Sequence, residues 1–162
     1  MGNLVHDKFM QIFRDTKGVK LLENERSIAI TDAESDIVIT GRLDNLIVLE
    51  KDGVPRIVDI KTTKSLAYTD SAKEDHVLQI MPYMKAMSIL DGAIIYVEKN
   101  TLKQKTFEVP YSKEAMKKVW HRAEELHLHL INGMVPKPES KLVGRAWECA
   151  YCQYSQECSK QG

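Results

Sequence analysis

The chain has 162 residues, which is enough for one domain with a substantial buried core. Hydrophobic residues make up 43% and charged residues 28%, as expected of an ordinary soluble globular protein. Lys plus Arg and Asp plus Glu number 23 each, so any surface that binds nucleic acid has to be local. No apolar run reaches the roughly 18 residues of a transmembrane helix, and residues 1–7 lack the basic and apolar regions of a signal peptide.

The N-terminal segment, residues 3–15, predicts an amphipathic helix. Its apolar residues recur at helical spacing and comprise Leu4, Val5, Phe9, Ile12 and Phe13. His6 lies near the edge of this apolar stripe. A histidine in such a place, judged alone, is more often a core or surface residue than a metal ligand.

Several short strands follow this helix. Segments 27–30 and 36–39 predict a hairpin across the polar turn 31–35. A further strand runs from Asp44 to about Glu50, and another covers 56–61. The loop 51–55 between these two strands contains Gly53 and Pro55, which are typical of a turn.

Two of these strands carry an aspartate beside apolar residues. Asp59 and Lys61 are two residues apart and therefore on one side of a strand, and an antiparallel neighbour would bring Asp44 close to both. Two carboxylates offer oxygen ligands to Mg²⁺, and an adjacent ammonium orients water or phosphate and offsets developing charge. The pattern favours metal-dependent phosphodiester chemistry. The alternative is a strand-end salt bridge of the aspartates with Lys61 or Arg42.

The segment 74–90 has helical spacing, with Pro82 inside it, which predicts a kink or a break between two helices. Gln79 and Tyr83 lie at i and i+4 and so share one face, and His76 is a candidate for the same face. By itself this pattern also describes an exposed polar face.

The next elements are strands at 93–97 and 105–109, joined as a hairpin, and a long helix at 112–131 that ends at Asn132 and Gly133. Ser112 is the expected N-cap of this helix. Its three histidines are predicted to form a solvated face rather than a metal site, and they are His121, His127 and His129.

The C-terminal segment begins with prolines after residue 134 and ends in a C-x2-C-x5-C pattern made by Cys149, Cys152 and Cys158. Three cysteines within ten residues of one another do not make the disulfide framework of a secreted fold, so we expect a reducing, cytoplasmic location. In such a chain, thiols this close favour a metal or iron–sulfur cluster over disulfides.

The order and approximate spacing of these residues resemble the motifs of the PD-(D/E)XK superfamily, and in particular those of RecB-like nucleases. The residues concerned are Asp44, Asp59-Ile60-Lys61 and Gln79-x3-Tyr83. The resemblance implies an α/β fold with a central mixed β-sheet flanked by helices, a restriction-endonuclease-like core. It would comprise residues 1–134, with the cysteine segment 135–162 packed on the same domain. It also implies Mg²⁺- or Mn²⁺-dependent cleavage of DNA, often exonucleolytic and on single strands or ends.

The resemblance also implies roles for individual residues. The metal ligands would be one ring nitrogen, two carboxylates and a backbone carbonyl, supplied by His6, Asp44, Asp59 and Ile60. Lys61 would orient or help activate the attacking water. Gln79 and Tyr83 would position Lys61 or the scissile phosphate.

The cysteine pattern resembles the C-terminal part of iron–sulfur RecB-like nucleases, which include CRISPR-associated nucleases and parts of helicase–nuclease complexes. Those proteins complete the cluster with a cysteine upstream of the first helix, and no cysteine precedes Cys149 here. The options are a cluster with an unusual or external fourth ligand, a zinc site closed by a histidine, or no metal.

DNA is the implied partner, with an integrase or helicase as a candidate protein partner. The rival functions are a non-cleaving DNA-end-binding or assembly subunit and a structure-specific endonuclease.

Overall fold

The computed structural model describes residues 2–32, 36–138, 140 and 144–159, with the backbone alone at residues 2–6, 9, 10 and 24. These residues form two compact units, 1–120 and 121–162, and each is described by itself. The domain limits expected from the sequence stay a prediction. Within the described part of the chain, no helix is both long and apolar enough to cross a membrane.

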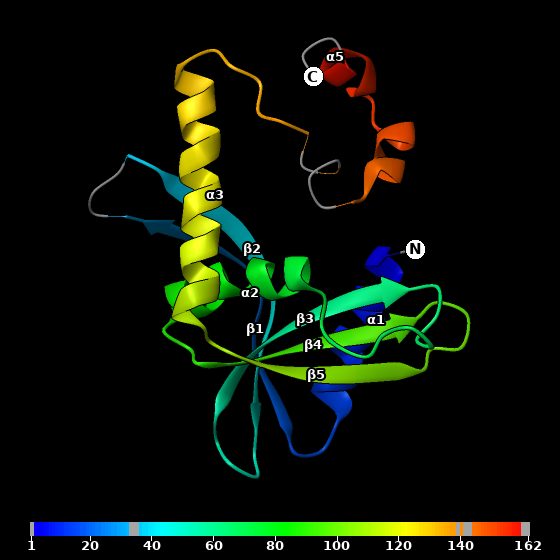
Figure 1. The fold of residues 1–162 in the computed structure, drawn as a ribbon. Coiled ribbons are helices and arrows are strands. Elements are labelled where there is room, and N and C mark those ends of the chain that lie inside the picture. Colours follow the sequence, from blue (N-terminus) through cyan, green and yellow to red (C-terminus); the bar gives the residue numbers. More distant parts are fainter. Residues whose placement is uncertain (1, 33–35, 139, 141–143, 160–162) are drawn as a thin grey trace. The chain divides into compact units, whose positions relative to one another are not determined.

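The first unit contains most of the regular structure (Figure 1). In chain order its elements are α1 (Gly2–Asp15), β1 (Val19–Thr31), β2 (Val38–Leu49), β3 (Pro55–Thr63), α2 (Glu74–Met87), β4 (Asp91–Glu98), β5 (Gln104–Pro110) and the beginning of α3 (Lys113–Ile131). The second unit holds the rest of α3, a short 3₁₀ helix η1 (Ala146–Tyr151) and α5 (Ser155–Ser159). The predicted α/β class is confirmed.

The five strands form one sheet in the order β1-β2-β3-β4-β5. Strands β3 and β4 are parallel, whereas the other neighbours are antiparallel, so the sheet is mixed as predicted. A parallel pair needs a long crossover connection, and α2 supplies it between β3 and β4.

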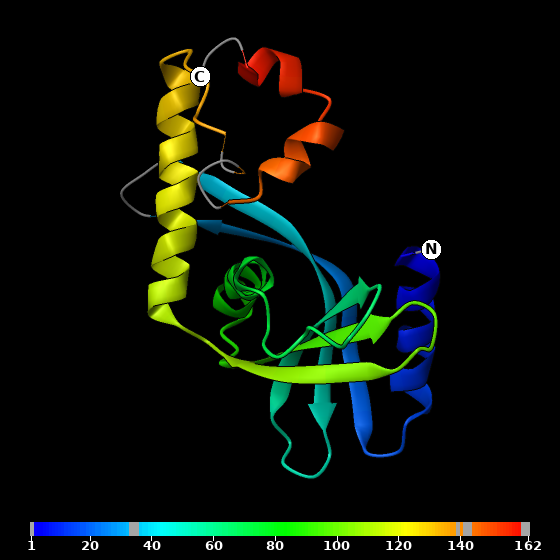
Figure 2. The same cartoon turned by 45° about the vertical axis from the view of Figure 1, so that its right-hand side comes forward.

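Helices cover both faces of the sheet (Figure 2). On one face, Ile80 and Met84 of α2 pack with Ile57 of β3 and Tyr96 of β4. On the other face, Phe13 of α1 packs in a cluster with Val58, Ile60 and neighbouring strand residues. Because successive residues of a strand point to opposite faces, β3 is buried on both sides by this arrangement.

The strand boundaries differ from the sequence expectation in β1 and β2. The expected strands 36–39 and 44–50 are parts of one long strand, β2, which continues through Gly41 and Arg42. The hairpin pairing itself is confirmed, since Ile30 lies opposite Ile39. Strand β1 also begins at Val19, well before the expected start, because residues 19–26 pair with the second half of β2.

The two long helices follow their sequence signals with small differences. Helix α2 is one element with Pro82 inside it, so of the two predicted alternatives, a kink or a break, the break is wrong. Helix α3 ends at Ile131, and Gly133 adopts a left-handed conformation with φ of 61°, as a C-terminal cap requires. The Ser112 hydroxyl accepts the backbone N–H of Ala115 at 3.1 Å, which confirms the expected N-cap.

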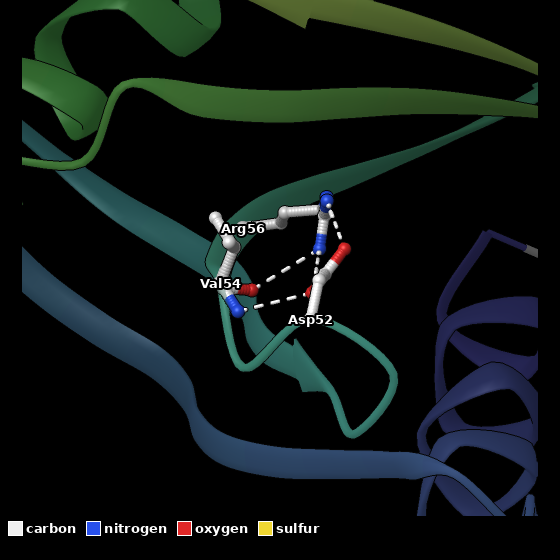
Figure 3. A network of polar contacts seen from close by, with 3 residues as sticks. All are labelled: Asp52, Val54 and Arg56. Carbon is white, nitrogen blue, oxygen red and sulfur yellow. Dashed lines mark hydrogen bonds and ion pairs between the residues drawn. The ribbon is translucent and has the colours of Figure 1, made fainter.

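The turn between β2 and β3 is held by Asp52 and Arg56 (Figure 3). Arg56 donates through both terminal nitrogens to the Asp52 carboxylate, at 3.0 and 2.7 Å. The same carboxylate accepts the backbone N–H of Val54 at 3.0 Å. A bidentate pair of this kind fixes geometry as well as adding energy. It therefore supports the register in which β2 meets β3.

Candidate functional site

The predicted acidic residues lie where β2 and β3 separate. The last residue pair between these strands is Asn45 opposite Val58. Beyond it, β2 continues beside β1, while β3 continues beside β4. One further step of the register would place Asp44 opposite Asp59. We call this point, formed by Asp44, Asn45, Val58 and Asp59, the strand fork.

Asp59 is a buried carboxylate beside a cation. Its side chain is 5% exposed, and its Oδ2 atom lies 3.0 Å from Nζ of Lys61. Among the described residues, Oδ2 accepts no hydrogen bond of good geometry. A buried charge is costly unless it is paired, so Lys61 or a metal ion has to compensate the Asp59 carboxylate. The salt bridge considered from the sequence is thus present between Asp59 and Lys61.

Lys61 also contacts the helix that crosses above the strand. Its Nζ atom donates a hydrogen bond of 2.7 Å to Oε1 of Gln79 on α2. Gln79 in turn hydrogen-bonds the Tyr83 side chain one helical turn later. The three residues form a chain from β3 to α2 that begins next to Asp59.

Tyr83 lies within electrostatic range of both acidic residues. Burial raises the pKa of Tyr83 above its ordinary value, and the charges of Asp44 and Asp59 raise it further. Hydrogen bonds with Gln79 and with the backbone of Arg42 act in the opposite direction on this pKa. Tyr83 therefore remains a neutral phenol at physiological pH and can donate its proton in a hydrogen bond.

Gly41 provides the space that the Tyr83 ring occupies. A Cβ atom at this position would lie 2.8 Å from Cε1 and 3.3 Å from the hydroxyl oxygen of Tyr83. Such a contact is far inside van der Waals distance, so the ring would have to move. Gly41 is therefore needed for the close approach of α2 to β2.

The side chains of Tyr96 and His76 form a further polar contact beside Lys61. The sequence alone did not predict this contact. Tyr96 on β4 is opposite Lys61 in the parallel register and is buried. Its hydroxyl accepts the N–H of Lys73 at 2.9 Å and lies 2.7 Å from Nδ1 of His76. Burial, then the charge of Lys61, lowers the pKa of His76, so its ring is neutral at pH 7. A hydrogen bond joins Nδ1 to the Tyr96 hydroxyl, and the tautomer of the neutral ring decides which of the two groups donates.

Oxygen donors at the strand fork and on the adjacent residue Ile60 suit a hard divalent cation. The two carboxylates and the backbone carbonyl of Ile60 are the donor type that Mg²⁺ takes, and Mg²⁺ needs few protein ligands because it keeps waters or substrate phosphates. His6 lies on α1, but its side chain is outside the described residues. Among the side chains that are described, no three from His, Cys, Asp and Glu gather as a metal site.

The cysteines of the second unit are all free thiols. Cys152 is exposed, and Cys149 and Cys158 are partly buried. The Cys149 sulfur lies 3.1 Å from the Ser140 hydroxyl. Among the described residues, these thiols do not gather with one another or with other His, Cys, Asp or Glu side chains into a group that could hold a metal ion. Of the helical histidines, His121 is exposed, while His127 and His129 are partly buried.

The similarity of this chain to a known family extends over nearly its whole length. The family model of the PD-(D/E)XK nuclease superfamily matches residues 1–159. The structure named SSO0001 has a TM-score of 0.68 and 21% sequence identity, covering 99% of this chain and 70% of the other. A phage-related exonuclease from Haemophilus somnus 129PT has a TM-score of 0.56 and 18% identity, covering 83% and 72%. At these identities the two structures show a common fold alone. No curated protein matches the sequence.

Proposed function

Because the chain belongs to the PD-(D/E)XK nuclease superfamily, we propose that it is a metal-dependent deoxyribonuclease that hydrolyses phosphodiester bonds as an exonuclease on single-stranded DNA or DNA ends. The observation that carries this proposal is the contact of Lys61 with Asp59 at the strand fork. In phosphodiester hydrolysis a buried carboxylate can bind the metal ion, and an adjacent ammonium can orient water or phosphate and offset developing charge.

The proposed metal site uses the oxygen donors of the strand fork. Asp44, Asp59 and the Ile60 carbonyl would hold Mg²⁺ or Mn²⁺, with His6 as a further ligand. When bound, such an ion polarises the phosphate and stabilises charge on the leaving oxygen. A histidine ligand would favour acceptance of Mn²⁺.

Lys61 would orient the attacking water and the scissile phosphate. An ammonium has three N–H donors, so contacts with Asp59 and Gln79 leave one for a water or a phosphate oxygen. Water adds to phosphorus and releases a proton to solvent as the bond to the leaving oxygen breaks, and that oxygen takes up a proton from solvent. Gln79 would fix the direction of the ammonium, and the neutral Tyr83 hydroxyl, which accepts a hydrogen bond from Gln79, would donate its own proton to the substrate.

The test is a nuclease assay with end-labelled single-stranded DNA and with closed circular DNA, in Mg²⁺, in Mn²⁺ and in EDTA. We expect metal-dependent loss of the linear strand only. Lys61→Ala and Asp59→Ala should abolish cleavage, whereas Lys103→Ala, a change of an exposed lysine in the β4–β5 turn, should leave it unchanged. Circular dichroism of each variant would check that the fold survives.

The outcomes separate the rival functions. Full activity of Lys61→Ala or Asp59→Ala would contradict the assigned site. Cutting of the circle would indicate an endonuclease, and DNA binding without cutting under either metal would indicate an end-binding or assembly subunit.

A bound iron–sulfur cluster or zinc ion in the C-terminal segment stays a prediction. No step of the proposed reaction uses this segment. An iron–sulfur cluster or a zinc ion would require Cys149, Cys152 and Cys158 to gather with a fourth ligand. Metal analysis and the visible absorption spectrum of anaerobically purified protein would test this. The CRISPR-like relationship, the integrase or helicase partner and the cytoplasmic location stay predictions.

A further inference from the structure

A recess in the first unit lies away from the strand fork. It has a volume of about 510 Å³ and is bounded by the C-terminal turn of α2, the beginning of β4 and the first turns of α3. We call it the α2/α3 groove, and its lining includes Met84, Lys85, Leu90, Met116, Lys117 and Trp120. A recess of this size accommodates one or two side chains of a ligand.

The floor of the α2/α3 groove is apolar. Met84 and Met116 are almost fully buried beneath it. Leu90 beside them is 66% exposed, and Tyr111 and Trp120 contribute aromatic surface. Methionine is flexible and polarisable and adapts to varied apolar partners. The floor can therefore receive a large apolar side chain.

The charged residues that line the α2/α3 groove are all lysines. Three exposed lysines line it, Lys85 from α2 and Lys113 and Lys117 from α3, and the lining contains no acidic residue. None of the three forms a close ion pair with a described residue, although the charge of Glu114 interacts with Lys113 and Lys117 at longer range. Lys113 and Lys117 are four residues apart and so lie on one face of α3, near its positive end.

The groove is separated from the proposed catalytic site by most of a strand. Leu90 immediately precedes Asp91, which lies opposite Arg56 in the β3–β4 register. Lys61 is five residues further along β3, a distance of roughly 16 Å at the rise of a strand. An occupant of the groove can therefore bind without covering Lys61.

We propose that the α2/α3 groove binds an acidic peptide segment of a partner protein, which inserts a large apolar side chain between the lysines. Carboxylates of the peptide meet the three ammonium groups, and its apolar side chain contacts the methionine floor. A nucleic acid would share the charge complementarity. However, sequence-tolerant binding of single strands relies on bases that stack on exposed aromatic side chains. In this groove the most exposed apolar side chain is Leu90, whereas Tyr111 and Trp120 are partly buried.

The test selects peptides from a random phage-displayed library on the immobilised full-length protein. The enriched peptides would be synthesised with a fluorescein label and titrated by fluorescence polarisation. We expect an acidic stretch beside a large apolar residue in the enriched sequences. The double variant Lys85→Glu/Lys117→Glu should weaken binding by about tenfold or more, since it places like charges against the peptide. Leu90→Ser should weaken it through the apolar contact.

The matched control is Lys51→Glu/Lys99→Glu, which makes the same charge change at exposed lysines in two other loops. It should leave peptide affinity unchanged, and all variants should keep the nuclease activity of the parent. Enrichment of no peptide, enrichment of non-acidic peptides, or equal binding by both double variants would overturn the proposal. Displacement of the peptide by a single-stranded oligonucleotide, prevented by Lys85→Glu/Lys117→Glu, would assign the groove to nucleic acid instead.

Discussion

The Nζ atom of Lys61 donates a hydrogen bond of 2.7 Å to Oε1 of Gln79, and this bond joins β3 to α2 across 18 residues of sequence. The same ammonium lies 3.0 Å from the Asp59 carboxylate. Two acceptors on different elements therefore fix its direction. A lysine side chain that is otherwise long and flexible is held in one place before any substrate binds.

Replacement of Gln79 by alanine should lower kcat by roughly ten- to a hundredfold, because a small misplacement of a reacting group costs that much. Substrate affinity should change little, since Gln79 acts through Lys61. Gln79 is exposed, so the free energy of unfolding should stay within about 0.5 kcal/mol of the parent. Steady-state kinetics and urea denaturation measure the two effects, with Gln104→Ala on β5 as control. A change confined to KM would argue that Gln79 contacts substrate directly.

The close contact between Gly41 and the Tyr83 ring leads to a prediction about packing. In Gly41→Ala the new Cβ would lie 2.8 Å from Cε1 of Tyr83, so the ring or the helix has to shift. We expect a loss of about 1–3 kcal/mol in the free energy of unfolding, as for other overpacked sites, and a fall in nuclease activity.

A double-mutant cycle isolates this contact. If the clash is the cause, Gly41→Ala should cost little further stability in a Tyr83→Ala background, where the ring is absent. Equal costs in both backgrounds would place the effect of Gly41 in the backbone of β2 rather than in the contact with Tyr83.

Much of the candidate site follows from local sequence patterns. The spacing of Asp59 and Lys61 determines that they share a strand face, and the turn at Gly53 and Pro55 makes β2 and β3 antiparallel neighbours. The i, i+4 spacing likewise puts Gln79 and Tyr83 on one side of α2. Each of these inferences needs only the residue periodicity of a strand or helix, or the residues of a turn. A short stretch of sequence contains this information.

Other relationships depend on register between distant elements. The position of Tyr96 beside Lys61 follows from the parallel pairing of β3 and β4, which no local pattern specifies. The continuity of β2 through Gly41 was missed because glycine weakens strand propensity, while the close approach of Tyr83 is what makes glycine necessary there. His76 was a candidate on its helix face, but its hydrogen bond with Tyr96 required the fold.

Removal of the Tyr96 hydroxyl should disturb the beginning of α2. In Tyr96→Phe the backbone N–H of Lys73 and Nδ1 of His76 both lose their partner, while the ring packing is kept. A lost hydrogen bond that leaves a partly buried group unpaired costs about 1–3 kcal/mol. We expect that loss in urea denaturation and a severalfold decrease in kcat, because Gln79 follows in the next turn. Tyr68→Phe, at an exposed tyrosine, is the control. Unchanged stability and activity would show that the hydroxyl is dispensable.

The pair of Asp52 and Arg56 predicts how stability depends on pH. Hydrogen bonds from Arg56 and from the Val54 backbone lower the pKa of Asp52 from its ordinary 3.8 to about 2. A carboxyl group whose pKa is lower in the folded state stabilises that state above its ordinary pKa. This contribution is lost as the pH falls from about 4 towards 2.

Asp52→Asn tests this contribution with little change of shape. The amide oxygen can still accept the Val54 N–H, so the variant removes mainly the charge that pairs with Arg56. Urea denaturation should show lower stability than the parent at pH 7 and a smaller decline between pH 4 and 2. Asp36→Asn, at an exposed aspartate outside this turn, should leave the parent profile unchanged. If Asp52→Asn retained the parent's decline in acid, another carboxylate would be its source. Since this turn joins the strands of Asp44 and Asp59, a loss of nuclease activity in Asp52→Asn at neutral pH would further show that the strand fork depends on it.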